Sequence, residues 1–233
     1  KQSAVVMLYD TKNNTKIQIT DEWFSSGGGN FSKDGKYLLF VSNRTFNPTY
    51  GNTEWNHIYT NMSKIYILPV MKDAEIPFAP KNDTIVVAKP TPPADKSAST
   101  SNKTADNYYF ENISARIIEV PVPAGQYRNL HMIGNSIYYS SRRGTAMFDI
   151  ESKKETDLQA MIIFGSGYKK AVAISNNNMQ VVDIPKAPVT ISKAIPLTGV
   201  KALVNYKEEW MQIYKESLRQ MRDFFYAKNM HGV

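Results

Sequence analysis

The sequence predicts an all-β fold, a partial β-propeller of about three blades of four-stranded antiparallel sheet, followed by a C-terminal amphipathic α-helix. Strand after strand is joined by short polar turns without a helical crossover, which argues against a parallel α/β sheet. Three hairpins of similar sequence recur along the chain, which indicates a repeated β unit. Near the C-terminus the apolar residues change from strand spacing to helical spacing.

The first expected hairpin joins Ala4–Asp10 to Thr15–Thr20 through the turn-rich segment TKNN. A second begins at Phe31, where Gly35 suits the positive-φ position of a short turn before the strand YLLFVS. Several of the remaining strands alternate polar and apolar residues or carry β-branched and aromatic ones, as half-buried antiparallel strands do. These further expected strands are Lys64–Val70, Asp83–Lys89, Ala115–Val122, NLHMIG, SIYYSS, TAMFDI, KAVAIS and MQVVDI.

The repeated hairpin is Phe31–Arg44, with echoes at Leu130–Gly144 and Phe164–Asn178. Each has a short strand, a Gly/Asn/Lys turn, an apolar strand and then Ser. The two echoes lie roughly 35 to 40 residues apart, a spacing typical of four-stranded propeller blades. Between them, Thr145–Leu158 is expected to supply two outer strands. The alternative is a β-sandwich whose turns resemble one another by chance.

Two segments interrupt this pattern. Arg44–Ser63 stands where a turn would normally join two strands, and its aromatic residues predict an ordered excursion. Residues 89–107 are rich in Pro, Ser, Thr and Lys with balanced charge, which predicts a flexible surface insertion. The expected domain boundaries are therefore a propeller portion over 1–184, a Pro-containing linker over 185–204 and a helical segment over 205–233.

The helical segment carries an apolar stripe at three- and four-residue steps, with charged residues on its other face. Its charges are mixed, so a membrane-surface role is not favoured. No apolar run is long enough to span a membrane. The stripe consists of Trp210, Ile213, Tyr214, Leu218, Met221, Phe224 and Phe225.

Charge and composition argue against several classes of function. The formal net charge is +7, but the basic residues are dispersed, unlike the clustered patch of a nucleic-acid-binding protein. There is no Cys, which excludes disulfides and Cys nucleophiles. His57, His131 and His231 form no metal-ligand pattern, and Gly165-Ser166-Gly167 is not a nucleophile elbow. We therefore predict no catalytic residue, metal or cofactor site in this chain.

The one candidate binding feature is the pair Arg142 and Arg143 in the segment SSRRGT. Two guanidinium groups can hold a peptide carboxylate by bidentate hydrogen bonds if the pair lines a channel. The alternative is a solvated pair in a loop, with no ligand.

Asp34–Val70 contains an Asn-His-Ile-Tyr element, and Glu111–Ser141 contains Pro-Val-Pro-x-Gly-x-Tyr. By these motifs the first segment resembles the second propeller of tricorn-type proteases, and the second segment resembles a later part of that propeller. Glu208–Val233, with Arg-Asp-Phe-Phe-Tyr and Asn-Met-His-Gly-Val, resembles the start of the first catalytic-core subdomain. The three segments follow the family's order.

The resemblance implies a part of a large serine peptidase that degrades oligopeptides, with the propeller guiding substrate or product to the active site. It implies that the catalytic residues lie in other parts of the polypeptide, and that His231 belongs to a structural motif. It also implies a homo-oligomeric full-length protein, in the cytoplasm or, as the alternative, exported. The competing interpretation is a stand-alone propeller interaction module without peptidase activity.

About three blades are fewer than the four to eight of a closed propeller, so we expect the native protein to continue at both ends. An unclosed set of blades leaves exposed sheet edges, which predicts an open, curved array or association through an edge.

Overall fold

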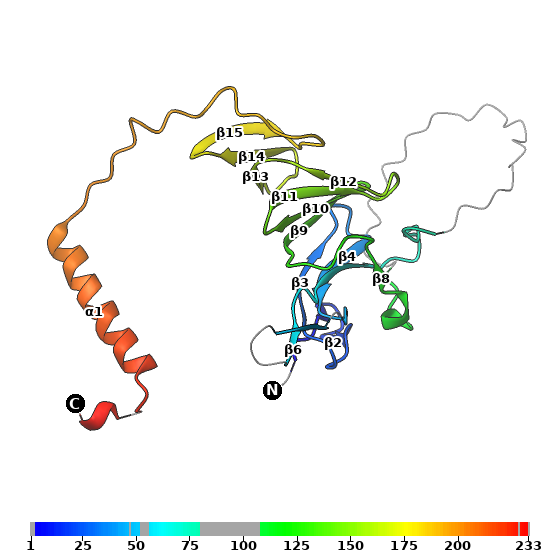
Figure 1. Cartoon of the computed structure of the whole chain (residues 1–233), viewed down its shortest axis with the longest axis horizontal. Coiled ribbons are helices and arrows are strands. Elements are labelled where there is room, and N and C mark those ends of the chain that lie inside the picture. Colours follow the sequence, from blue (N-terminus) through cyan, green and yellow to red (C-terminus); the bar gives the residue numbers. More distant parts are fainter. Residues whose placement is uncertain (1–2, 47, 52–55, 80–107, 228, 233) are drawn as a thin grey trace, which may run out of the picture. The chain divides into compact units, whose positions relative to one another are not determined.

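The computed structural model describes residues 3–46, 48–51, 56–79, 108–227 and 229–232. The chain divides into two compact units, Lys1–Ala194 and Ile195–Val233, and each is described by itself. In the described residues of the first unit every sheet is antiparallel, and the larger sheets follow one another in chain order (Figure 1). The predicted insertion at 89–107 and the predicted strand Asp83–Lys89 lie outside the described residues.

The first four-stranded sheet is a meander in the order β3-β4-β7-β8. Its two middle strands are buried along nearly their whole length, because the sheet is covered on both faces. Gly35, with φ of 73°, takes the left-handed position in the turn between β3 and β4, as predicted. The strands are β3 (Ser26–Phe31), β4 (Tyr37–Ser42), β7 (Lys64–Pro69) and β8 (Ile118–Glu119).

The excursion between β4 and β7 is ordered in its described part, as predicted. It forms a small hairpin of β5 (Pro48–Tyr50) and β6 (His57–Tyr59). The rings of Tyr50 and His57 pack with centroids 4.8 Å apart, which brings the two strands of this hairpin together.

The expected strand at Ala115–Val122 is wrong over most of its length. The chain there forms a 3₁₀ turn, η1 (Ile113–Arg116), and then only the two paired residues of β8. The Arg116 guanidinium donates to the carbonyl of Pro69 at 2.9 Å and stacks over the Tyr109 ring, which anchors the turn. Beyond β8, Pro121 has no N–H to donate to a ladder, so the strand ends.

The second four-stranded sheet has the order β12-β11-β10-β9, so the segment after the repeated hairpin does supply two outer strands. A third sheet has three strands, β13-β14-β15, and a hairpin of β1 and β2 precedes the first sheet. The bounds are β1 (Met7–Asp10), β2 (Thr15–Gln18), β9 (Arg128–Ile133), β10 (Ser136–Ser141), β11 (Gly144–Asp149), β12 (Lys154–Asp157), β13 (Met161–Phe164), β14 (Lys170–Ser175) and β15 (Asn178–Asp183).

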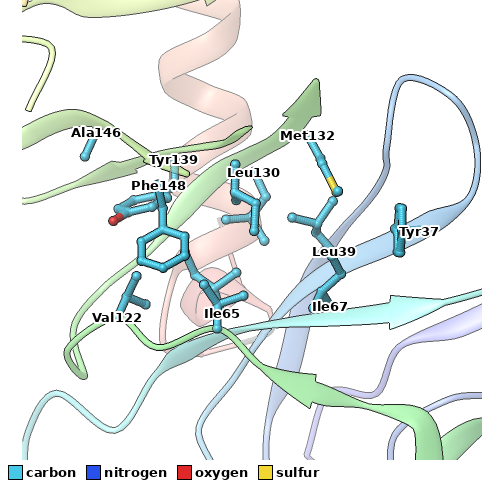
Figure 2. Packing of buried hydrophobic residues seen from close by; sticks show 12 residues of the cluster. Tyr37, Leu39, Ile65, Ile67, Val122, Leu130, Met132, Tyr139, Ala146 and Phe148 are labelled. Carbon is cyan, nitrogen blue, oxygen red and sulfur yellow. The ribbon is translucent and has the colours of Figure 1, made fainter. Parts of the chain in front are cut away.

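Three apolar clusters join these sheets face to face. The largest lies between the first and second four-stranded sheets, where Ile65 and Ile67 of β7 belong to one cluster with Tyr139 and Phe148 (Figure 2). A second cluster joins the other face of the first sheet to the β1–β2 hairpin, and a third joins the second sheet to β13–β15. Each fully buried side chain of this size contributes about 1.5–3 kcal/mol. We call the sheets β3-β4-β7-β8, β9–β12 and β13–β15 the first, second and third blades.

The second unit contains α1 (Tyr206–Phe224) and a 3₁₀ turn, η2 (Met230–Gly232). Glu208 and Glu209 lie in the first turn of α1 and Arg222 in the last, where they complement the helix dipole. None of its side chains is buried, so the apolar stripe is exposed along this helix. Within the described residues, no helix is long and apolar enough to cross a membrane.

Candidate functional site

Arg142 and Arg143 form the two-residue turn between β10 and β11, and both are exposed. Gly144 follows with φ of 123°, a conformation that a residue with a side chain rarely adopts, and this lets the hairpin turn tightly. The two arginines border different hollows. The turn therefore separates the pair that the sequence suggested would act together.

The hollow beside Arg143 has a volume of about 200 Å³ and is also lined by Glu155 and Asp157. These two carboxylates oppose the approach of a second carboxylate. The hollow beside Arg142 has a volume of about 500 Å³, and none of the described residues that line it is acidic. Only Arg142 therefore has surroundings that suit an anionic ligand.

A second arginine, Arg128, lines the hollow beside Arg142. Arg128 begins β9, and Arg142 Nε donates a hydrogen bond of 3.3 Å to Gln126 Oε1. Met161 of β13 lies on the same hollow, which therefore opens at the boundary between the second and third blades. The sequence analysis did not identify Arg128, because no sequence motif links it to Arg142 or to Met161.

His131 lies elsewhere in β9 and connects three sheets. Its Nδ1 lies 3.3 Å from Asn30 Nδ2 of β3 and 3.0 Å from the Tyr168 hydroxyl in the turn between β13 and β14. Its ring also packs on Phe164, with centroids 4.7 Å apart. Burial lowers the pKa of His131 below its usual value, so the ring is neutral near pH 7. These contacts hold the blades together.

The other two histidines have different neighbours. His57 packs on Tyr50 in the small hairpin, and His231 contacts Tyr226 in the second unit. Over the described ranges, no group of three or more His, Cys, Asp or Glu side chains is arranged to hold a metal ion.

Two family profiles match the chain. The profile of the tricorn protease second beta propeller domain matches residues 1–189, and that of the tricorn protease C1 domain matches residues 206–233.

Curated proteins of the same kind are similar over most of the chain. Tricorn protease homolog 1 of Streptomyces coelicolor is 21% identical over 87% of this chain and 21% of its own length. The tricorn protease of Thermoplasma volcanium is 19% identical over 96% of this chain and 22% of its own length. The chain thus spans about a fifth of the length of these relatives.

The crystal structure of the tricorn protease superposes with a TM-score of 0.67 and 15% identity, over 96% of this chain and 22% of that one. At this identity the likeness shows the fold alone. It confirms the predicted fold class, a partial β-propeller followed by a helix.

Proposed function

Because this chain belongs to the tricorn protease family, we propose that it is the noncatalytic propeller portion of a tricorn-like serine peptidase that degrades oligopeptides. In this proposal the blades guide substrate or product to an active site that other parts of the polypeptide supply. The full-length protein would be a homo-oligomer, as the sequence resemblance implies. That resemblance to the family is itself confirmed by the profile matches.

One observation carries the proposal. The two matched domains occur in one chain in the order propeller and then C1, and the similarity to the tricorn protease of Thermoplasma volcanium covers 96% of the chain and so extends across both. A stand-alone interaction module would have no need of a C1 segment after its blades. The competing interpretation is therefore less well supported.

The hollows in the first unit agree with a role in handling peptides. The hollow beside Arg142 is lined by arginine, hydroxyl and apolar side chains. A peptide offers carbonyl, carboxylate and apolar groups to such a lining. We extend the predicted peptide-binding role to Arg142 and not to Arg143, since Arg143 lies beside two carboxylates.

The test compares two proteins, this 233-residue chain and the longest natural polypeptide that contains it. Each is incubated with a mixture of unmodified oligopeptides, and the products are followed by mass spectrometry. We expect cleavage by the longer polypeptide, abolished by a serine-directed covalent inhibitor, and no cleavage by the chain alone. A longer polypeptide that carries no peptidase activity would contradict the proposal, and cleavage by the chain alone would contradict its noncatalytic role.

A further inference from the structure

We propose that the hollow between Arg128 and Arg142 is an anion site that holds a carboxylate group of a peptide. The inference rests on the proposed function, which provides peptides as ligands, and it adds a site and the chemical group that the site recognises. We define this "blade-boundary site" by Arg128, Asn129, Ser140, Arg142, Thr145 and Met161.

The backbone turns Arg128 toward this site by a β-bulge. Along β9, His131 pairs with Tyr138, but Arg128 pairs with Ser140, so β9 contains one extra residue between these pairs. In an uninterrupted ladder Arg128 would lie opposite Ser141 and on the other face of the sheet, because side chains alternate. The bulge moves it to the face that carries Ser140 and Thr145.

The backbone conformation of Asn129 accommodates the bulge. Its φ is 52°, in the left-handed region that Asn tolerates better than most residues do. Its side-chain amide lies 3.4 Å from the Ser140 hydroxyl, within the blade-boundary site. The local backbone thus fixes the direction of Arg128 through its neighbour.

The first blade has the same bulge but no arginines. In β3 the pairing shifts between Gly27 and Asn30, and Gly28 has φ of 66°. Aligned on this shift, Gly27 corresponds to Arg128 and Asn43 to Arg142. A Cβ on Gly27 would meet no atom within 4 Å. The bulge therefore does not require an arginine, and the first blade lacks both cationic side chains at the corresponding positions.

The charge at the site is uncompensated. Several other basic side chains have a carboxylate partner, as Lys64 has in Glu119 and Lys170 in Asp183. Among the described residues Arg128 and Arg142 form no ion pair, and Arg142 instead donates to the neutral amide oxygen of Gln126. Two guanidinium groups on one concave surface without an acid favour a bound anion.

The lining also indicates what accompanies the anion. Met161 is 53% exposed and brings an apolar surface to the site from β13. A planar guanidinium binds a carboxylate through paired hydrogen bonds, and the thioether side chain packs on a neighbouring apolar group. A carboxylate next to an apolar residue fits this combination. A peptide C-terminus and an acidic side chain within a peptide share that chemistry.

The experiment measures binding to the full 233-residue chain by fluorescence anisotropy. Three peptides labelled at the N-terminus are compared: one ending in Leu with a free carboxylate, the same peptide amidated, and an amidated peptide with an internal Glu. The variants are Arg128→Gln, Arg142→Gln, the charge-retaining Arg128→Lys, and the matched control Arg143→Gln from the same turn. Circular dichroism checks that each variant folds.

We expect Arg128→Gln and Arg142→Gln each to raise the Kd of a carboxylate peptide about tenfold, the loss of one charge-assisted hydrogen bond. Arg128→Lys should lose less affinity than Arg128→Gln, and Arg143→Gln should bind like the unchanged chain. Loss of affinity on amidation identifies the C-terminal carboxylate as the ligand, whereas binding of only the Glu peptide identifies the acidic side chain.

Carboxylate peptides that bind equally well to the unchanged chain and to both Gln variants would overturn the inference, as would the absence of any binding to the unchanged chain. If Arg128→Gln fails to fold, the Arg142→Gln result decides. The proposed function is judged separately, by cleavage in the longer polypeptide, so either can fail without the other.

Discussion

The Nδ1 atom of His131 in the second blade lies 3.0 Å from the hydroxyl oxygen of Tyr168 in the third. The same nitrogen lies 3.3 Å from Asn30 Nδ2 of the first blade. The Asn30 amide nitrogen can only donate, so Nδ1 is its acceptor and the ring proton of neutral His131 resides on Nε2. One imidazole therefore connects three successive blades while it remains neutral.

Acidification should weaken the first unit through His131. Burial lowers the pKa of this ring in the folded state below its value of about 6.5 in the unfolded chain. The unfolded state therefore binds more protons than the folded state. The contribution of His131 to the free energy of unfolding is fully present above about pH 6.5 and is lost as the pH falls below that value. A protonated Nδ1 would also place an N–H against the Asn30 donor.

Urea denaturation at pH 7.5 and pH 5.0 measures this effect in the unchanged chain and in His131→Gln. The unchanged chain should lose stability between the two pH values, and the variant should lose less. The carboxylates of Asp10 and Asp149 titrate below this pH range, because hydrogen bonds lower their pKa values. Equal losses in both proteins would show that His131 does not titrate in the expected direction.

Removal of the Tyr168 hydroxyl should cost the first unit about 1 kcal/mol in free energy of unfolding, the typical net contribution of one hydrogen bond. Tyr168→Phe keeps the ring contact with Phe164, so the loss reports the hydroxyl alone. The control is Tyr50→Phe, whose side chain is largely exposed and whose substitution should change stability by less than about 0.5 kcal/mol. Indistinguishable melting curves for the two variants would contradict the prediction.

The core between the first two blades should be sensitive to truncation. Ile67 is fully buried, and Ile67→Ala leaves a cavity between the sheets, with an expected cost of about 2–5 kcal/mol. Ile76 is the matched control, since it is 66% exposed and Ile76→Ala should change stability by less than about 0.5 kcal/mol. Thermal and urea denaturation measure both, and similar costs would show that this interface is not a cooperative core.

The third blade should promote association of the chain. One face of its sheet carries rows of apolar residues from all three strands, in which Ile163 pairs with Val172 and Val172 with Val181. Ile163 is 48% and Val181 53% exposed, and exposed apolar rows of this kind favour contact with another surface. This is a face-to-face route, in addition to the edge pairing expected from the sequence.

Sedimentation velocity over a range of concentrations tests this association. Val181→Lys and Ile163→Lys should shift the distribution toward the monomer, because each places a charge on the apolar face. Asn178→Lys, an exposed polar position of the same strand β15, adds the same charge and should have no effect. A monomeric unchanged chain at every concentration would contradict the prediction.

Local pattern was enough to predict the hairpins and the helix. Gly35 permits the turn that starts β4, and apolar spacing predicts α1, because both depend on residues close in the chain. The aromatic residues between β4 and β7 also predict an ordered excursion, and the structure has a β5–β6 hairpin there. The repeated hairpins predicted successive blades, which the structure contains as separate antiparallel sheets.

Other features depend on contacts between distant residues. A 3₁₀ turn stands in place of the first part of the expected strand. It is held by a hydrogen bond from the Arg116 guanidinium to the carbonyl of Pro69, forty-seven positions away in the chain. The bulge at Asn129 shows only in the pairing of β9 with β10. No local pattern predicts either feature, since each depends on a partner residue that is distant in the chain.

The amino-acid sequence therefore indicates most of the strands, several of their turns and their repetition as blades. Strand pairing within the second blade settles which face Arg128 takes, and the turn between β10 and β11 separates Arg142 from Arg143. Packing between the blades brings Met161 of β13 to the same hollow as Arg128. The physical reason is the two-residue period of a strand. A single inserted residue reverses the direction of a side chain, and only the pairing partner reveals the insertion.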